Sequence, residues 1–271
     1  MALKLGAATF SYLWKCPLEE SFKALANMGY RYIEIPTAPP HFWPRSMDLK
    51  EREAIRKAAA KNGLEIVAIN PTGQDLNLAS TNPGIYEETI VQLKEQIKLA
   101  HDLGAKVIVF PGGRVHSLVP APVEKARQLV KEALERCVED AEKFRVVFGL
   151  ENVPFSFLKL ATDLISIIKE INSPFLGITY DIPNAFMVED PIKGLEEVAP
   201  YLALVHVSDT TKKSWGHMPI GTGEVDFAAV ARKLIQIGYK GITILEVTQP
   251  SDPESGIKAS TSRLELLGWE R

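Results

Sequence analysis

Eight short apolar runs alternate with amphipathic stretches along the whole chain, and this alternation constrains the fold more than any other feature. The runs cover residues 3–9, 30–35, 64–69, 106–110, 146–150, 175–180, 202–205 and 242–245. A run that is apolar throughout is typical of a strand buried on both faces, and helices of this length between such strands specify parallel βαβ units. The pattern therefore predicts eight parallel strands with a helix after each.

The helical period is clearest in two of the amphipathic stretches. One face of the first stretch carries Ile85, Thr89, Leu93, Ile97 and Ala100. One face of the second carries Val123, Ala126, Val130, Ala133 and Cys137. Apolar residues three and four apart lie on one stripe of a helix, so we expect both stripes to pack against the sheet.

The lengths of the connections distinguish a closed barrel from an open sheet. Turns from helix to strand are tight and contain a glycine, as at Gly29, Gly63 and Gly104, whereas strand-to-helix connections such as 70–83 and 208–225 are long. An open doubly wound sheet is the alternative, but the first strand lacks the glycine-rich turn that its dinucleotide sites require. We predict one (β/α)8 barrel, with residues 1–271 as a single domain and the functional site at the carboxyl ends of the strands.

Composition excludes several kinds of partner. The net charge of -3 gives no basic surplus for a nucleic acid, and no apolar run approaches the roughly 20 residues of a membrane span. The amino terminus reads as a strand and lacks the layout of a signal peptide. Cys16 and Cys137 fall on an early loop and a helix face, which favours free thiols and a cytoplasmic location over a disulfide.

Four side chains that can bind a metal follow the last four predicted strands. These are Glu151, Asp181, His206 and Glu246. In a closed barrel their strands are neighbours, and three carboxylates converging on the axis would repel one another without a cation. An oxygen-rich set with one nitrogen suits Mn²⁺ first, with Mg²⁺, Co²⁺ and Zn²⁺ as alternatives. The simpler interpretation is that each acid is solvated at its own strand end.

Small residues precede two of these ligands. Strand alternation places Gly149 on the side of Glu151, and Gly177 on the side of Asp181. Small inward residues leave room for a common centre, so we expect both glycines to face the barrel interior.

The ligands and the residues around them resemble the xylose isomerase-like TIM barrels, and the resemblance covers the whole chain. The matching segments are 29–34, 151–152, 181–184, 206–209, 221–227 and 245–246. The resemblance implies a metal-dependent isomerase or epimerase that moves a proton on a keto-sugar or related polyhydroxylated carbonyl compound through a metal-stabilised enediolate. It implies that Glu151 and Glu246 act as acid and base besides binding the metal, and that Asp181 and His206 are ligands only. It also favours a homo-oligomer, a dimer or a tetramer.

Other activities of the superfamily remain as alternatives. A dehydratase of inosose or dehydroshikimate type would share the first proton transfer, and a third interpretation is a barrel that binds a metabolite without converting it. The AP endonucleases hold three metals with additional histidines, but the corresponding positions here are Asn70, Pro111 and Asn184. We therefore disfavour a nuclease.

Substrate contacts are expected on the loops around the ligands. Asn184 stands where ketose epimerases of this superfamily carry histidine, and an amide can bind a hydroxyl but cannot take its proton. Lys212 is, with its neighbour Lys213, nearest in position to an arginine of those enzymes, although a solvated loop charge is the alternative. His217 is predicted to contact the substrate or to act as a general acid.

Three further residues are candidates for the same role. Glu34 ends the second strand and either reaches the site or holds a loop by hydrogen bonds. Trp14 on the first loop either covers the substrate or packs on the surface. Arg114, after two glycines, either binds an anionic group or belongs to a plain turn.

Overall fold

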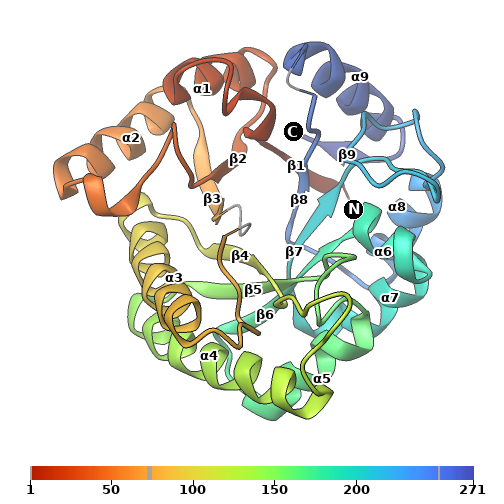
Figure 1. The fold of residues 1–271 in the computed structure, drawn as a ribbon. Coiled ribbons are helices and arrows are strands. Elements are labelled where there is room, and N and C mark those ends of the chain that lie inside the picture. Colours follow the sequence, from red (N-terminus) through yellow and green to blue (C-terminus); the bar gives the residue numbers. More distant parts are fainter. Residues whose placement is uncertain (1, 72–74, 250) are drawn as a thin grey trace.

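The barrel predicted from the sequence is present and closed. In the computed structural model, which describes residues 2–71, 75–249 and 251–271, eight parallel strands form the barrel, and β1 pairs with both β2 and β8 (Figure 1). The strands are β1 Leu3–Ala8, β2 Tyr32–Pro36, β3 Glu65–Asn70, β4 Val107–Pro111, β5 Val147–Glu151, β6 Leu176–Asp181, β7 Leu202–Val207 and β8 Ile242–Leu245. Closure excludes the open doubly wound sheet.

Helices surround the barrel and follow the strands in order. They are α1 Leu18–Asn27, α2 Leu49–Lys61, α3 Pro83–Leu103, α4 Val123–Phe144, α5 Ala161–Ile171, α6 Ile182–Val188, α7 Pro191–Val198, α8 Phe227–Gln236 and α9 Pro253–Glu265, with 3-10 turns at Phe10–Tyr12, Pro44–Ser46 and Ala199–Tyr201. Two helices, α6 and α7, follow β6. None of the helices in the described part of the chain is long and apolar enough to cross a membrane.

One strand was not predicted from the sequence. The two-residue strand β9, Trp269–Glu270, pairs in parallel with β1 through Leu3 and Trp269 and lies outside the closed barrel. A strand this short has no recognisable apolar run, so only tertiary pairing reveals it. Trp269 is buried and ties the end of the chain to the barrel.

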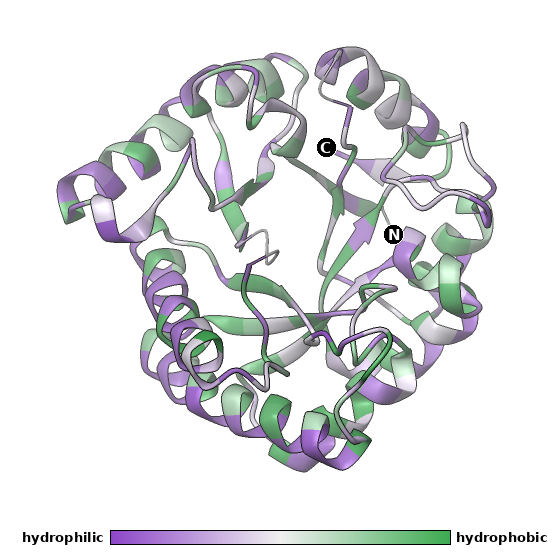
Figure 2. Cartoon of the chain, viewed as in Figure 1, coloured by the Kyte–Doolittle hydropathy of each residue, from purple (hydrophilic) through white to green (hydrophobic). Residues whose placement is uncertain are grey.

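Apolar side chains form two layers, one on each side of the strands. The larger layer lies between the strands and the helices, and the smaller one fills the barrel below the site with residues such as Val109, Leu204 and Ile244. Figure 2 shows hydrophobic strands inside a ring of helices whose outer faces are hydrophilic. This double burial explains why the strand sequences are apolar throughout.

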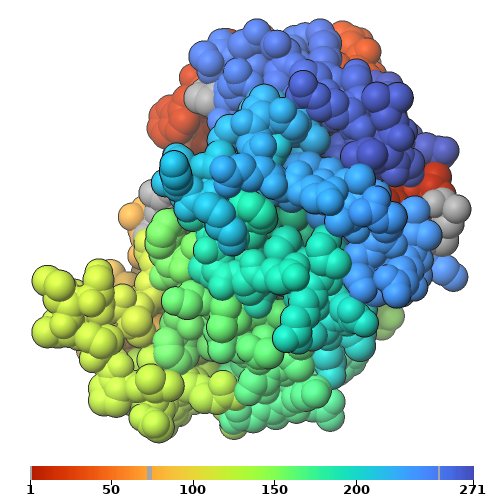
Figure 3. All heavy atoms as spheres, turned by 90° about the vertical axis from the view of Figure 1, so that its right-hand side faces the viewer, coloured from red at the N-terminus to blue at the C-terminus, as the bar shows by residue number. Residues whose placement is uncertain are grey.

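The predicted stripes of α3 and α4 pack inward except at their first residues. Ile85 and Val123 are 44% and 64% exposed, so their assignment to the buried faces was wrong. With 21 and 22 residues these helices are roughly 32 Å long, whereas a five-residue strand spans roughly 17 Å. The amino-terminal turns therefore extend beyond the barrel, and the connection into α4 projects from the body of the molecule (yellow-green in Figure 3).

The two glycines below the ligands face the barrel interior, as predicted. A Cβ atom on Gly149 would lie 2.3 Å from Thr179 Oγ1, and one on Gly177 would lie 3.0 Å from the Cβ of Ala203. Any larger residue at position 149 would collide with the side chain of the neighbouring strand. The missing side chains allow the side chains of neighbouring strands to pack directly beneath the site.

Candidate functional site

Four buried side chains that could bind a metal meet at the carboxyl ends of β5 to β8. Glu151 and Asp181 are the last residues of β5 and β6, His206 lies near the end of β7 opposite Asp181, and Glu246 directly follows β8. One ligand atom from each residue lies within 4.8 Å of the others. The predicted convergence of these four side chains is confirmed.

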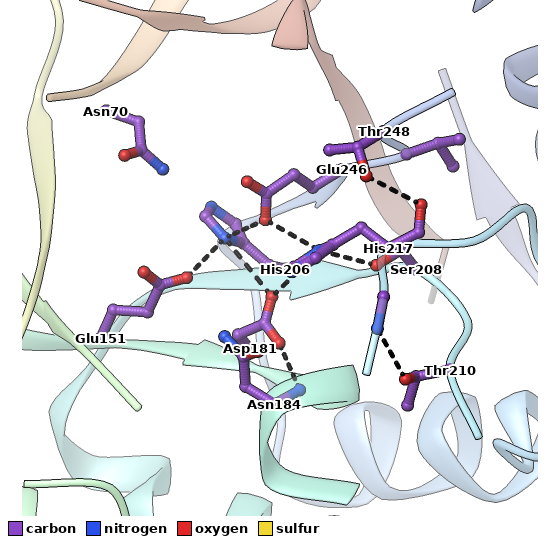
Figure 4. Close-up of polar contacts among 12 residues, drawn as sticks. Asn70, Glu151, Asp181, Asn184, His206, Ser208, Thr210, His217, Glu246 and Thr248 are labelled. Atoms are coloured by element: carbon purple, nitrogen blue, oxygen red, sulfur yellow. Dashed lines mark hydrogen bonds and ion pairs between the residues drawn. The ribbon is translucent and has the colours of Figure 1, made fainter. Parts of the chain in front are cut away.

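The imidazole of His206 lies at the centre of the three carboxylates. Its Nδ1 is 3.0 Å from Glu246 Oε2, 3.3 Å from Glu151 Oε1 and 3.8 Å from Asp181 Oδ2. Figure 4 shows all three carboxylates directed toward this ring. His206 and Asp181 are fully buried and the two glutamates nearly so, which keeps bulk water from screening the cluster.

The unsatisfied atoms of the cluster fit a bound cation. Asp181 Oδ2, His206 Nδ1 and Glu246 Oε2 are buried without a hydrogen-bond partner among the residues that the structure describes. The other oxygen of Asp181 accepts the backbone N–H of Asn184 at 2.6 Å, because Asp181 also caps the amino terminus of α6. Buried polar atoms are normally satisfied, so three such atoms around one point fit a divalent metal with one nitrogen and three carboxylate ligands.

A fourth carboxylate supports the histidine from behind. Glu34, the third residue of β2, is fully buried, and its Oε2 lies 2.9 Å from His206 Nε2. A carboxylate can only accept here, so Nε2 carries a proton, and the Nδ1 atom on the opposite side of the ring faces the cluster as the atom that could bind a metal after losing its own proton. Asn70 Nδ2 donates to the other oxygen of Glu34 at 3.3 Å.

The excess of negative charge changes the acidity of the whole cluster. Burial, together with the charges of Glu151 and Glu246, raises the pKa of Asp181 well above its usual range. Burial also raises the pKa of Glu151, whereas His206 and His217 outweigh burial and lower the pKa of Glu246.

The pKa of His206 is raised, as is that of Asp181. Burial lowers the pKa of His206, but the carboxylates of Glu34 and Glu246 raise it more, and the result is well above the ordinary histidine value. Protons thus compensate the carboxylates when no cation does. A bound metal must displace these protons.

A residue that the sequence analysis missed organises the β7–α8 loop. Asp209 is fully buried, and its carboxylate accepts backbone N–H groups from Thr210, Gly221, Gly223 and Val225. A Cβ atom on Gly223 would lie 2.4 Å from Asp209 Oδ1, so glycine is required there. An aspartate three residues after a ligand histidine, followed by a G-x-G segment, is the signal that could have identified this anchor.

A pocket of about 590 Å³ opens onto the cluster. Its lining includes Glu151, Glu246, Arg114, Asn184, His217, Phe10, Asn70, Phe155, Ser156, Trp215 and Thr248. The sequence analysis assigned the first five to the site, and did not single out Phe10, Phe155, Ser156 or Thr248. These four lie on connections between strands and helices, where the sequence gives no periodic signal.

The three remaining candidates lie away from the wall of this pocket. Glu34 is engaged with His206 and Asn70 on the far side of the imidazole. Trp14 is 80% exposed. Lys212 donates to the backbone oxygen of Phe186, and its ammonium group lies 4.4 Å from the centre of the Phe186 ring.

His217 approaches the cluster from the β7–α8 loop. Its Nδ1 lies 3.4 Å from Glu246 Oε2 and 3.0 Å from the hydroxyl of Ser208 (Figure 4). The imidazole thus lines the pocket beside the acidic cluster.

Comparison with known proteins gives consistent relatives. The profile of the family described as "Xylose isomerase-like TIM barrel" matches residues 22–267. An uncharacterized protein of Methanocaldococcus jannaschii, MJ1311, is 28% identical over 250 residues, which cover 90% of this chain and 83% of that protein. The L-ribulose-5-phosphate 3-epimerase UlaE of Escherichia coli (strain SE11) is 21% identical and covers 90% and 87% of the two chains.

The same likeness extends to a solved structure. The crystal structure of a D-tagatose 3-epimerase-like protein superposes with a TM-score of 0.85 at 26% identity, covering 98% of each chain. The two proteins therefore share the barrel fold over almost their whole lengths.

Proposed function

This chain belongs to the xylose isomerase-like TIM barrel family, and from that premise we propose that it is a divalent-metal-dependent isomerase or epimerase of a keto-sugar or a related polyhydroxylated carbonyl compound. One observation carries the proposal. Three buried and unsatisfied ligand atoms surround one point, and two of the carboxylates of that cluster, from Glu151 and Glu246, also line an adjoining pocket. Such a site can hold a metal and a small substrate side by side.

We propose that Glu151, Asp181, His206 and Glu246 hold one metal, with Mn²⁺ as the preferred ion and Mg²⁺, Co²⁺ or Zn²⁺ as alternatives. When bound, such a cation supplies positive charge that makes a C–H bond next to a carbonyl more acidic.

The two glutamates would carry the proton. One carboxylate of the Glu151 and Glu246 pair removes a proton from the carbon next to the carbonyl, and the other returns one to the opposite face or to the neighbouring carbon. Return to the opposite face gives an epimer. Return to the carbonyl carbon, with transfer of the hydroxyl proton to the former carbonyl oxygen, gives an isomer. Both residues line the pocket, whereas Asp181 and His206 are fully buried and therefore act as ligands only.

Other side chains would bind and orient the substrate. We propose Asn184, His217 and Arg114 as contacts because each lines the pocket. Glu34 would act indirectly, by fixing the ring of His206. We leave Trp14 and Lys212 outside this set because neither lines the pocket.

Hydrogen exchange tests the proposal even when the product has not been identified. The Mn²⁺-loaded protein would be incubated in D₂O with a panel that includes D-tagatose, L-ribulose and L-ribulose 5-phosphate, and deuterium at the carbon next to the carbonyl would be read by NMR. We expect incorporation with at least one ketose and a loss of about 10²- to 10⁴-fold in rate in Glu151→Gln and in Glu246→Gln.

The matched control is Glu189→Gln, which changes a carboxylate held by the Tyr180 hydroxyl and the Ala161 N–H away from the pocket. It should exchange at the wild-type rate. Failure of the metal-replete protein to bring about exchange in any ketose would contradict the proposal and favour a barrel that binds a metabolite without converting it.

A dehydratase is the second candidate, and the position of His217 favours it. After a carboxylate removes the proton next to the carbonyl, the bond from the next carbon to its hydroxyl would break. The imidazolium of His217 would protonate the departing oxygen, so that water leaves. An enone product would absorb in the ultraviolet, and incubation with inosose or dehydroshikimate-like hydroxyketones would reveal it.

A further inference from the structure

The indole of Trp215 fixes the side-chain amide of Asn184. Trp215 Nε1 lies 2.7 Å from Asn184 Oδ1. An indole nitrogen can only donate, so the amide oxygen must face Trp215 and the NH₂ group must face the other way. This assignment follows from chemistry and does not depend on distinguishing nitrogen from oxygen.

The backbone of Asn184 is fixed as well. Its N–H donates to Asp181 Oδ1 at 2.6 Å in the first turn of α6, and the residue is only 2% exposed. Asn184 is thus attached through its backbone N–H to a candidate metal ligand and through its side-chain amide to the β7–α8 loop.

Trp215 is in turn held by its neighbours. Its ring makes edge-to-face contacts with Phe155 and His217, with centroid distances of 5.3 and 5.6 Å. The same loop is anchored by the four hydrogen bonds to Asp209. The indole therefore keeps its orientation although 42% of the residue is exposed.

The NH₂ group of Asn184 has no partner among the residues described, and Asn184 lines the pocket beside the acidic cluster. We propose that Trp215 is a positioning residue that presents both N–H donors of Asn184 to the substrate. The pair then selects compounds that present an acceptor oxygen, a hydroxyl or carbonyl, to Asn184 beside the acidic cluster. The inference rests on the proposed function and specifies which feature of the substrate this wall of the pocket recognises.

This arrangement also restricts the chemistry at that position. An amide whose oxygen is occupied by an indole can donate hydrogen bonds but cannot accept a proton. A substrate hydroxyl bound there would therefore keep its proton throughout the reaction. Proton transfer would be left to Glu151 and Glu246.

The hydrogen bond from Trp215 Nε1 to Asn184 Oδ1, here called the Trp215–Asn184 lock, can be tested without substrate. The Mg²⁺-loaded protein labelled with ¹⁵N has four tryptophans, and Trp14, Trp43, Trp215 and Trp269 each give one indole N–H signal. We expect the Trp215 signal, identified by its loss in Trp215→Phe, to move upfield and to exchange faster with solvent in Asn184→Ala. The other three signals should stay in place. An unmoved Trp215 signal would overturn the lock.

Ligand binding tests the consequence. The affinity of the Mg²⁺-loaded protein for D-tagatose, or for whichever ketose binds best, would be measured by calorimetry. Loss of one oriented hydrogen bond should weaken binding about 3- to 10-fold in Trp215→Phe, which keeps an aromatic ring on Phe155. Trp43→Phe is the matched control, because Trp43 is similarly exposed at 38% and lies outside the pocket wall.

A double variant separates positioning from direct stacking on the sugar. If Trp215 acts through Asn184, the double variant Trp215→Phe/Asn184→Ala should bind no more weakly than Asn184→Ala alone. Losses that add would overturn the inference, since Trp215 would then contact the ligand by itself. If the wild type binds no ketose, the proposed function fails, and the indole signal still decides whether the lock exists.

Discussion

The contact between Glu34 and His206 makes a specific prediction for Glu34→Gln. The substitution keeps the shape of a fully buried side chain and removes its negative charge. It also replaces one acceptor oxygen by a donor, although both neighbours, His206 Nε2 and Asn70 Nδ2, offer donors to this group. One of the two must lose its acceptor or turn around.

The magnitude follows from the type of hydrogen bond that is lost. A bond to a charged group contributes about 1.5–3 kcal/mol and a neutral one about 0.5–1.5 kcal/mol, so the difference is about 1–1.5 kcal/mol. That difference corresponds to about tenfold in a binding constant. Residues that orient a metal-binding histidine typically change affinity about 10- to 100-fold, so we expect the dissociation constant for Mn²⁺ or Co²⁺ to rise by that amount.

The assay is competition with a chromophoric chelator at fixed pH, supported by the visible spectrum of the Co²⁺-loaded protein. Glu189→Gln is the matched control, because it neutralises a carboxylate hydrogen-bonded to Tyr180 on the outer side of β6. It should leave metal affinity unchanged. If Glu34→Gln binds metal within twofold of the wild type, Glu34 does not orient His206 and the reasoning is refuted.

Three further predictions concern stability. Burial raises the pKa of Glu151 and Asp181, so in the metal-free protein these groups stabilise the fold at pH values below their unfolded pKa of about 4. This contribution is lost as the pH rises through their pKa values in the folded protein. Glu246 has a lowered pKa and acts in the opposite sense. Because metal binding requires the ionised groups, the thermal shift caused by a fixed concentration of Mn²⁺ should increase from pH 5 to pH 8. The shift should reach about 5 °C where that concentration is 100 times the dissociation constant, and a shift independent of pH would contradict this prediction. Asp209→Asn should lower the free energy of unfolding in urea by at least about 2 kcal/mol, since a neutral amide with one oxygen cannot accept four backbone N–H groups. Gly149→Ala should cost about 1–3 kcal/mol in the same assay because the added methyl would lie 2.3 Å from a neighbouring hydroxyl, and an unchanged midpoint would show that the barrel interior can adapt.

The sequence alone determined the barrel and the four side chains that converge at its carboxyl end. Apolar runs of strand length separated by helical stripes permit few arrangements, and long connections at one end of the strands orient the site. Because side chains alternate along a strand, Glu151 and Asp181 had to face the same interior as Gly149 and Gly177. Each of these inferences depends on local periodicity, which a single chain displays directly.

Tertiary structure decided how the ligands are supported. The contact of Glu34 with His206 joins residues 172 positions apart, and that of Trp215 with Asn184 joins residues 31 apart, one on the β7–α8 loop and one in α6. Hydrogen bonds of this kind leave no period in the sequence, because they depend on which strands face each other across the closed barrel and on where loops fold back over it. The exposure of Ile85 and Val123 at the starts of α3 and α4 was missed for a similar reason, since a helical stripe does not reveal where the strand beneath it ends. Patterns along the chain fix which residues face inward, whereas closure of the barrel fixes which of them touch.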